Sequence, residues 1–521
     1  MTDCCAKQDF DTFTRNTIKP TTSINRHEIT RGLFIEAGTT SDGNCNPACT
    51  ETELQLASSE PIKIELGQSW FTAVRGQSCV VELNNLNIAF RNLSCTASQM
   101  SDKFKLPARY GAGEKSVWVE YIQLAAEYKP AVNLGQGFPD YHAPKHVTKA
   151  LGEIAISENP LLNQYTRGFG HPPLIQSLSK VYSPLIGKEI NPQNEILVTY
   201  GAYEALYSAI LGHVEEGDEV IVIEPFFDCY DFMIKSAGGI PRFIALNPKK
   251  TTGTVTSADW VLDEKELESL FSSKTKMIIL NTPHNPLGKV FTRQELELIA
   301  NLCKKHNVLC LSDEVYEWMV FEPVQHIRIA TLPGMWERTI TVGSAGKTFS
   351  VTGWKTGWAY GPAALMFNLQ VVHQNCVYTC CTPIQEAISR SFEYELARRD
   401  SPDCYFKALA RELLPKRDFL VNTLRENGFN PTIPEAGYFI IADWTKLANK
   451  IDLSSEGDKY KDYKFTKKFA KETGVLTIPP TAFYSEGHKH LGENFARFCF
   501  IKKDENLSLA GKLMKEWNAK K

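Results

Sequence analysis

Short apolar runs alternate with helical patterns through the middle of the chain, from about residue 151 onward. The apolar runs have the length of strands and lie at residues 196–199, 219–223, 276–280, 308–311 and 339–342. Strands separated by helices of this length are typical of a parallel sheet that helices cover on both faces. The pattern therefore predicts an α/β fold with a large domain at residues 151–395.

The segments on either side of this domain have a different texture. Residues 118–128 show an amphipathic helix pattern, and an apolar run at 132–134 leads into a glycine turn. After residue 395 come a long charged helix at 405–427, apolar segments at 438–442 and 495–500, and a last amphipathic helix. Residues 116–150 and 396–521 therefore predict a second, smaller α+β domain.

The first 115 residues fit neither pattern and predict an N-terminal extension. Up to residue 60 the chain is rich in Thr, Ser, Asn and Asp with little periodicity, which predicts poor order. Alternating apolar positions at 62–90 predict a few strands, without any cluster of reactive side chains. The texture changes at Met100, which resembles a second start, so we expect residues 1–99 to be dispensable for activity.

Composition excludes several classes of protein. The 521 residues are 43% hydrophobic with a net charge of −3, so no basic field favours nucleic acid. No apolar stretch approaches the length of a membrane span, and the N-terminus lacks secretory and transit patterns. The 14 cysteines show no zinc spacing, which indicates reduced thiols and no metal site. We therefore expect a cytoplasmic protein, with a mitochondrial pool left open.

The candidate chemistry centres on residues 343–358, where small residues lead to Lys347. A lysine among apolar neighbours loses part of its preference for the charged form, and a neutral amine attacks carbonyl groups. A nucleotide-binding loop also ends in Gly-Lys-Thr, but it requires a glycine at the position of Thr341. The plainer alternative, a surface lysine on a glycine-rich turn, is disfavoured by the motifs that accompany Lys347.

Other polar clusters follow the predicted strands, at the edge where ligands gather in parallel α/β sheets. Gly201 follows the run at 196–199 and opens a helix, whose free amides suit a phosphate. Asp313 closes the run at 308–311, where a buried carboxylate needs a cationic or N–H partner such as a pyridinium nitrogen. A helix N-cap explains this aspartate about equally well.

Two more strand ends offer contacts to a planar ring. Prolines flank Asn285 closely enough to present its amide rigidly, although a plain turn is the alternative. Phe226 and Phe227 follow the run at 219–223 and offer a face for stacking, although aromatic pairs more often belong to the core. Each cluster alone indicates little, whereas their order along the chain indicates more.

That order resembles the pyridoxal-phosphate enzymes of the aspartate aminotransferase fold. Four segments closely resemble the kynurenine aminotransferase family, namely QGFPD at 136–140, EPFFDCY at 224–230, NPLGKVF at 285–291 and GSAGKTFSVTG at 343–353. This family is also known as glutamine transaminase K and cysteine-S-conjugate β-lyase. The resemblance covers residues 118–521 but not the first hundred, and it implies a homodimeric enzyme with pyridoxal 5'-phosphate as cofactor.

Position by position, the resemblance implies the residues that hold the cofactor. Lys347 would form the Schiff base and shuttle protons, and Asp313 would keep the ring nitrogen protonated. Tyr316 would bond the ring hydroxyl oxygen and complete the catalytic set with these two. The other expected cofactor contacts are Ala202, Tyr203, Phe227, Asn285, Ser344, Lys355 and, from the other subunit, Tyr165.

The resemblance also implies a substrate pocket. Arg497 would clamp the α-carboxylate bidentately, assisted by Gly137 and Asn285, and Trp118 would wall the side-chain pocket. An arginine within an apolar run is costly to bury without an anionic ligand, which supports this role independently. Tyr378 stands where vertebrate members carry the first residue of a Phe-His pair that lines the neighbour's pocket, a departure that bears on side-chain specificity.

The activity that the resemblance implies is transamination of kynurenine and other bulky neutral or aromatic amino acids (glutamine, phenylalanine, methionine, tryptophan) with a 2-oxo acid. Cysteine S-conjugates would undergo β-elimination. The alternatives are an aminotransferase of this fold with another preference, or a decarboxylating or condensing member. A non-catalytic regulator is disfavoured because the first 115 residues show no helix-turn-helix pattern.

Overall fold

The computed structural model describes residues 62–66, 69–73, 104, 107, 109 and 116–521. The chain divides into two compact units, Met1–Lys105 and Leu106–Lys521. In the first unit, strands β1 (Ile62–Leu66) and β2 (Ser69–Ala73) form an antiparallel hairpin within the segment where strands are predicted. The predictions for residues 1–60 and for Met100 fall outside the described residues.

A seven-stranded sheet with the order β4-β13-β12-β11-β10-β5-β6 dominates the second unit. Its strands are β4 (Ile196–Thr199), β5 (Glu219–Glu224), β6 (Ile240–Ala245), β10 (Thr275–Asn281), β11 (Leu309–Asp313), β12 (Thr339–Ser344) and β13 (Gly357–Tyr360). Neighbouring strands pair in parallel except at β13, which is antiparallel to both β12 and β4. The five strands predicted from apolar runs are all present.

The apolar pattern does not reveal β6 and β13. As an edge strand, β6 exposes alternate residues and tolerates Pro241, a residue that in the sequence argues against a strand. Between β12 and β13 the chain reverses through the four-residue helix α10 (Ala345–Thr348) and through Lys355, which is left-handed with φ 50°. This tight reversal leaves no room for a crossover helix, so β13 returns antiparallel.

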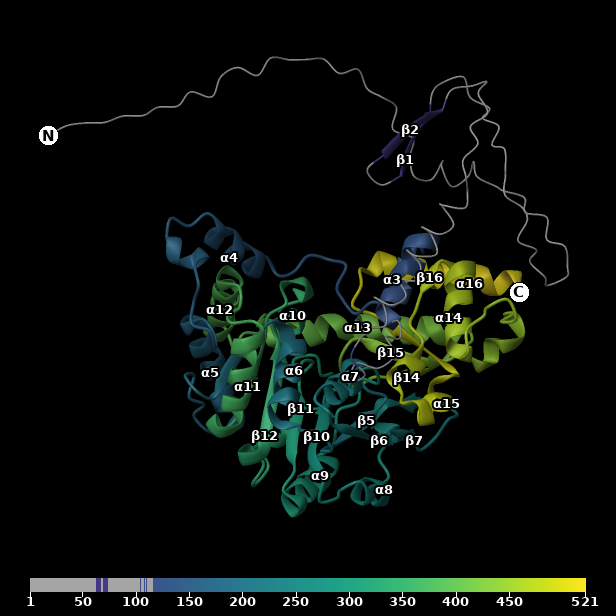
Figure 1. Ribbon diagram of the computed structural model, residues 1–521. Helices are drawn as coiled ribbons and strands as arrows, with labels where there is room; N and C mark the ends of the chain where they lie inside the picture. The colour runs from purple at the N-terminus through teal and green to yellow at the C-terminus, as the bar shows by residue number, and fades with distance from the viewer. Residues whose placement is uncertain (1–61, 67–68, 74–103, 105–106, 108, 110–115) are drawn as a thin grey trace, which may run out of the picture. The chain divides into compact units, whose positions relative to one another are not determined.

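Alternate residues of the central strands pack into different hydrophobic clusters. In β5, Val220 and Val222 belong to one cluster, and Ile221 and Ile223 to another. Helices α6 (Gly201–His213), α7 (Cys229–Ser236) and α11 (Ala363–Cys376) contribute to the first, and α8 (Glu264–Ser269) and α9 (Arg293–His306) to the second. The sheet is therefore covered on both faces, as predicted (Figure 1).

A third cluster lies beside the β4 edge of the sheet. Residues of β4 and β13 pack there against α4 (Lys145–Ala155), α5 (Pro172–Ile186) and α12 (Thr382–Ala397). Figure 1 shows these three helices together at one side of the large sheet. None of the described helices is long and apolar enough to cross a membrane, and the compartment of the protein stays a prediction.

The C-terminal segments form a second core around a four-stranded sheet, β17-β15-β14-β8. Its strands are β8 (Val255–Thr256), β14 (Asn430–Ile433), β15 (Phe439–Asp443) and β17 (Phe495–Cys499). Helices α13 (Tyr405–Glu426), α14 (Lys461–Thr473) and α16 (Asp504–Lys520) pack on it. The remaining elements include α3 (Val117–Tyr128), α15 (Lys489–Gly492), β7 (Asn247–Pro248) and β9 (Trp260–Val261).

A segment that precedes the large sheet in sequence joins this second core. Strand β3 (Val132–Asn133) pairs in parallel with β16 (Val475–Leu476), and both Val132 and Leu134 are buried in the cluster. The turn after β3 thereby comes to lie beside β17, because the Cys499 amide donates to the Leu134 carbonyl at 2.7 Å. The exact domain boundaries predicted above stay a prediction.

Candidate active site

The ends of β10, β11 and β12 and the first turn of α6 border a cavity of about 250 Å³. It is lined by Gly201, Ala202, Tyr203, Leu206, Phe227, Asn281, Asn285, Asp313, Val315, Tyr316, Ser344, Gly346, Lys347, Thr352, Lys355 and Thr356. Every residue predicted to hold the cofactor lies here except Tyr165. These residues meet because parallel strands bring their carboxyl ends to one edge of the sheet.

Lys347 lies in α10, directly after β12, with its side chain in the cavity. Its Nζ donates a hydrogen bond to the Tyr438 hydroxyl and lies 3.5 Å from the Gly137 carbonyl oxygen. Burial lowers the pKa of Lys347 from 10.5 to about 8, because the charged ammonium loses its hydration. About a tenth of such amines are neutral at pH 7, so Lys347 is suited to act as a nucleophile and a proton acceptor.

Asp313 is the last residue of β11 and is buried. Its carboxylate accepts hydrogen bonds from the Tyr230 hydroxyl at 2.6 Å and the Val315 amide at 3.4 Å. Burial raises the pKa of Asp313 to about 6 in spite of these bonds. No helix begins after Asp313, so the N-cap alternative is wrong, and a cationic partner in the cavity would stabilise the carboxylate.

The first turn of α6 forms an anion cradle with the residues after β12. Gly201 has φ +74°, and Lys355 is so near that a Cβ at Gly201 would lie 3.5 Å from its Nζ. A Cβ at Gly357 would lie 2.4 Å from the Ala202 amide nitrogen, so glycine lets β13 approach the helix closely. Free amides at the positive end of a 13-residue helix, next to a lysine, suit a phosphate group.

Asn285 is held in the turn after β10. Its backbone N–H donates to the Asn281 side-chain oxygen at 2.7 Å. The Asn281 side-chain nitrogen donates to the Asp313 backbone carbonyl at 2.9 Å. The turn is thereby tied to the end of β11. Phe227 lines the cavity, whereas Phe226 is buried and stacks on Phe243, so one member of the aromatic pair belongs to the site and the other to the core.

Arg497 projects from β17 and is 1% exposed. Its Nη2 donates to the Gly135 carbonyl at 2.9 Å and its Nη1 to Asn285 Oδ1 at 3.4 Å, while its Nε has no partner among the described residues. Burial lowers the pKa of Arg497 to about 10, because the charged guanidinium loses its hydration. A buried guanidinium that forms no ion pair within the described part of the chain is an effective receptor for a carboxylate.

Aromatic rings surround this guanidinium. The Arg497 Cζ atom lies 4.1, 4.9 and 5.2 Å from the ring centroids of Phe439, Phe483 and Trp118. Trp118 is oriented by its indole N–H, which donates to Asp228 at 2.9 Å. Gly137 completes the group, because a Cβ there would lie 2.4 Å from Phe439 Cζ. Trp118, Gly137, Asn285 and Arg497 are therefore brought together, as the resemblance implies.

Tyr165 and Tyr378 are not part of the cavity of their own chain. They are 85% and 60% exposed, and their rings meet edge to face at 5.9 Å between centroids. Tyr378 has a left-handed backbone with φ 71°. Their predicted roles both involve a neighbouring subunit, so their position outside the cavity agrees with those roles without testing them.

Several residues of the site have no clear signal in the sequence. Tyr438, which contacts Lys347, and Phe483, which covers Arg497, occur in segments that read as ordinary core. Tyr230 bonds Asp313 from a position within one of the quoted motifs. Only the spacing of Tyr230 after a strand could have suggested its role, whereas the other two depend on contacts between distant segments.

Glu204, His373 and Cys380 have potential ligand atoms within 4.8 Å of one another. Hydrogen bonds account for the first two: Glu204 accepts from the Tyr200 amide at 2.8 Å, and the two ring nitrogens of His373 lie 2.8 Å from Glu204 Oε1 and 2.9 Å from the Gly168 carbonyl. The cluster ties α6 to α11, and it leaves no ring nitrogen of His373 free for a metal.

The cavity residues fit pyridoxal phosphate. The α6 amides, Ser344 and Lys355 suit the phosphate, Asp313 suits a protonated ring nitrogen, and the Lys347 amine suits the carbonyl carbon. The surroundings of Asp313 test this fit, because its buried carboxylate has only the Tyr230 hydroxyl and the Val315 amide as donors among the described residues, and a cation in the cavity would stabilise it.

The chain is similar to known aminotransferases over most of its length. The family model for aminotransferase class I and II matches residues 129–513. The chain is 52% identical to kynurenine–oxoglutarate transaminase 3 of Mus musculus, over 82% of this chain and 93% of that protein. Kynurenine–oxoglutarate transaminase 1 of Homo sapiens is 46% identical, over 77% and 95%. The solved structure of Bna3p from Saccharomyces cerevisiae is 36% identical with a TM-score of 0.73, over 78% and 97%.

Fold and site together define an aminotransferase that depends on pyridoxal phosphate. The chain belongs to the class I and II aminotransferases, within the family that includes these kynurenine–oxoglutarate transaminases. The predicted family, fold, enzyme class and cofactor are thereby confirmed, and the non-catalytic alternative is wrong. The roles of individual residues remain proposals that rest on their geometry.

Proposed function

We propose that this protein transfers the amino group of kynurenine, and of other bulky neutral or aromatic amino acids, to a 2-oxo acid. The choice of kynurenine as amino donor is supported by the protein's relatives, which are named kynurenine–oxoglutarate transaminases. The geometric support is the turn at residues 135–137: Arg497 donates to the Gly135 carbonyl at 2.9 Å, and Lys347 Nζ lies 3.5 Å from the Gly137 carbonyl. A carboxylate receptor and a proton acceptor thus flank the place of a substrate's α-carbon.

Each residue then has a task that its surroundings favour. When bound, pyridoxal phosphate supplies an electron sink that makes the substrate's α-proton acidic. Asp313 would keep the ring nitrogen of the cofactor protonated, and Asn285 and Tyr316 would orient the ring by hydrogen bonds. Arg497 binds the α-carboxylate, which fixes the α-carbon near Lys347. Lys347 Nζ, neutral in part because of burial, takes the α-proton and returns it.

The side-chain preference follows from the rings around Arg497. Trp118, Phe439 and Phe483 present apolar faces, which favour aromatic and other bulky neutral side chains over charged ones. Another amino donor within this class remains the alternative, because Tyr378 departs from the family's vertebrate pattern. Elimination from cysteine S-conjugates stays a prediction and is tested by repeated turnover without any acceptor, with release of equal amounts of thiol, ammonia and 2-oxo acid.

The donor is identified by adding excess L-kynurenine, without oxo acid, to the purified holoenzyme and recording the visible spectrum. Conversion of the cofactor to its amine form in the wild type, but not in Lys347→Ala, is the expected result. Conversion by glutamine or phenylalanine but not by kynurenine would establish transamination with a different donor. No conversion by any of these amino acids would overturn the proposal.

We also propose a homodimer in which Tyr165 reaches the partner's phosphate site. Large apolar side chains are exposed near Tyr165 and on α11, namely Ile156, Leu161, Phe367, Val371 and Tyr378. Exposed apolar side chains of this size in such number are typical of an interface. Their burial against a second copy would also place Tyr165, 85% exposed here, in contact with a neighbour.

Mixed dimers test this arrangement directly. Tyr165→Ala and Lys347→Ala subunits are each expected to give weakly active or inactive homodimers. If Tyr165 serves the partner's site, a mixed dimer has one site with both residues intact, so mixing should restore up to half the activity per active site. If mixing restores nothing although co-purification through a different affinity tag on each variant shows mixed dimers, Tyr165 does not act across the interface.

A further inference from the structure

The Lys347 amine contacts Tyr438, a residue that has no role in the proposed function. Tyr438 directly precedes β15, is 1% exposed and packs its ring edge to face against Tyr316 at 5.2 Å between centroids. Its hydroxyl accepts a hydrogen bond from Lys347 Nζ and donates one to the Gly137 carbonyl at 2.9 Å. Lys347 Nζ, the nitrogen that is proposed to move protons, is therefore hydrogen-bonded to a phenol hydroxyl.

The direction of these two bonds follows from proton counting. A backbone carbonyl only accepts, so the single phenolic proton of Tyr438 points to Gly137 and its oxygen lone pair faces Lys347. Burial raises the pKa of Tyr438 well above its usual range, so the phenol keeps this proton at neutral pH. Tyr438 therefore cannot take a proton from Lys347; it can only hold one of its N–H groups.

The hydroxyl is not needed to hold the tyrosine in place. The Tyr438 carbonyl accepts from the Phe500 amide at 2.9 Å, and the next residue, Phe439, pairs with Cys499 in the sheet. The ring belongs to the buried core that contains Phe439 and Phe498. Removal of the oxygen atom alone should therefore change the surroundings of Lys347 Nζ and of the neighbouring Tyr316 hydroxyl, and leave the backbone where it is.

We propose that Tyr438 is a positioning residue that holds the free ε-amine of Lys347 beside the Gly137 carbonyl, ready for proton transfer at the substrate's α-carbon. The inference rests on the proposed function of Lys347. Gly137 lies in the same turn as Gly135, whose carbonyl accepts a hydrogen bond from Arg497. The contact with Tyr438 therefore holds the Lys347 amine next to the turn that also supports Arg497, the carboxylate receptor. One hydroxyl thus sets the distance between the proton acceptor and the bound substrate.

The test compares Tyr438→Phe with Tyr360→Phe in the full-length holoenzyme. Tyr360 is a matched control, because it is equally buried and does not line the cavity. In Tyr438→Phe, kcat should fall about 10- to 100-fold, since misplacement of a proton acceptor by about 1 Å has effects of this size, while KM stays within about twofold. The isotope effect of an α-deuterated donor on kcat should rise, because proton transfer becomes slower.

A second readout does not depend on turnover. In the full chain freed of cofactor, trace acetylation of Lys347 as a function of pH reports the titration of its amine. The midpoint should move to lower pH in Tyr438→Phe, because the ammonium form loses a hydrogen-bond acceptor. It should stay unchanged in Tyr360→Phe.

The outcomes separate this inference from the proposed function. An unchanged kcat and an unchanged acetylation midpoint in Tyr438→Phe would overturn the inference, as would loss of the cofactor's visible band, which would mean a merely structural role. A wild type that transaminates no donor would overturn the proposed function instead. The acetylation midpoint would still decide whether Tyr438 holds Lys347.

Discussion

Two ends of the active site differ in how the chain builds them. At the cofactor end, Asp313, Ser344, Lys347 and the first turn of α6 come from the ends of neighbouring strands of one sheet. At the carboxylate end, which consists of Arg497 and its contacts, the guanidinium comes from the second sheet and meets Gly135 and rings from three other segments. One end follows from topology, and the other follows from packing between distant segments.

The same physical cause has different consequences at the two ends. Burial lowers the pKa of Lys347 from 10.5 to about 8 and that of Arg497 to about 10. At pH 7 the lysine is neutral in about a tenth of the molecules, whereas the arginine is charged in almost all of them. Burial therefore turns the lysine into a proton acceptor while the arginine stays a cation, which explains the choice of residue at each end.

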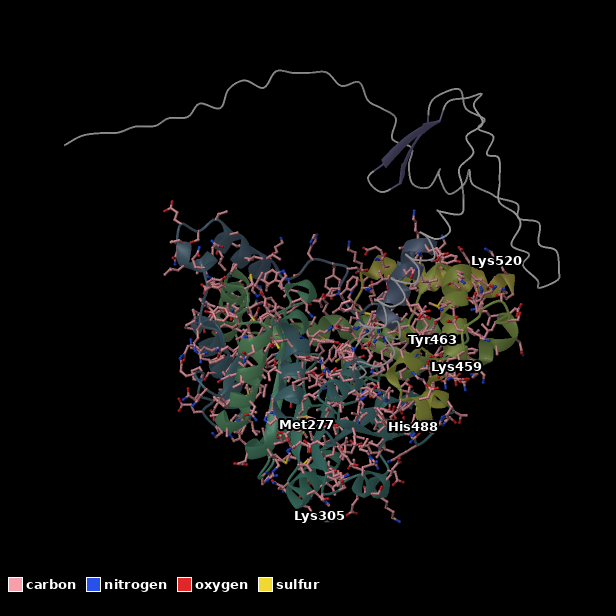
Figure 2. The ribbon with its side chains drawn as sticks, viewed as in Figure 1. Met277, Lys305, Lys459, Tyr463, His488 and Lys520 are labelled. Carbon is pink, nitrogen blue, oxygen red and sulfur yellow. The ribbon has the colours of Figure 1, made fainter. Side chains whose placement is uncertain are left out.

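Loss of the amine should have the largest effect. Lys347→Ala removes the proton acceptor and the Schiff-base amine, so kcat for kynurenine should fall by about 10⁴-fold or more. Lys305→Ala is the control: this lysine is exposed on α9, pairs with Glu268 at 2.8 Å and does not line the cavity. Figure 2 shows it at the lower edge of the view. Steady-state rates decide, and a fall of less than tenfold in Lys347→Ala would contradict the assignment.

Loss of the guanidinium should reduce substrate capture while it stabilises the fold. In Arg497→Met, kcat/KM should fall about 10³-fold, because the α-carboxylate loses its buried partner. The lowered pKa of Arg497 means that its charge costs of the order of 3 kcal/mol at neutral pH, a cost that disappears only as pH rises above about 10.

The same variant should therefore unfold at higher urea concentration than the wild type at pH 7. Arg242→Met, at a position 45% exposed and 3.7 Å from Glu219, should change neither property. If Arg497→Met lowers the free energy of unfolding, the guanidinium stabilises the core, and the idea that its buried charge destabilises the fold is wrong.

At the cofactor end, Asp313→Asn should lower kcat about 10²-fold, because the ring nitrogen loses its charged partner. Burial raises the pKa of Asp313 to about 6, so the carboxylate form prevails above that pH and the acid below it. Affinity for the cofactor, measured by fluorescence titration, should therefore fall in the wild type as pH drops through about 6. The variant should lack this step, and a step of equal size in the variant would assign it to another group.

The smallest effect is expected from the hydrogen bond between Trp118 and Asp228, which orients one of the rings around Arg497. Trp118→Phe removes the indole N–H that donates to Asp228, so kcat/KM should fall about fivefold, equivalent to about 1 kcal/mol. In a double-mutant cycle with Asp228→Ala, the second substitution should add little, because the two groups act through one bond. Fully additive effects would show that Trp118 acts without Asp228.

Much of the large sheet is readable from local pattern. The apolar runs of β5, β10 and β12 are buried on both faces, so they stand out as unbroken hydrophobic segments. Once these strands are recognised as parallel, their carboxyl ends must share an edge, and the residues after them must share a site. Asp313 and Lys347 could therefore be placed together from sequence, and the motif order supplied the family.

Only the tertiary structure decided the contacts between segments that lie far apart in the chain. Trp118 meets Asp228 across 110 residues and Lys347 meets Tyr438 across 91, and no local periodicity encodes either pair. The pKa values of Lys347 and Arg497 are also tertiary, because they arise from the removal of water by neighbouring segments. Residue types and their order specify which chemistry is present, whereas packing sets the protonation, distance and orientation that this chemistry needs.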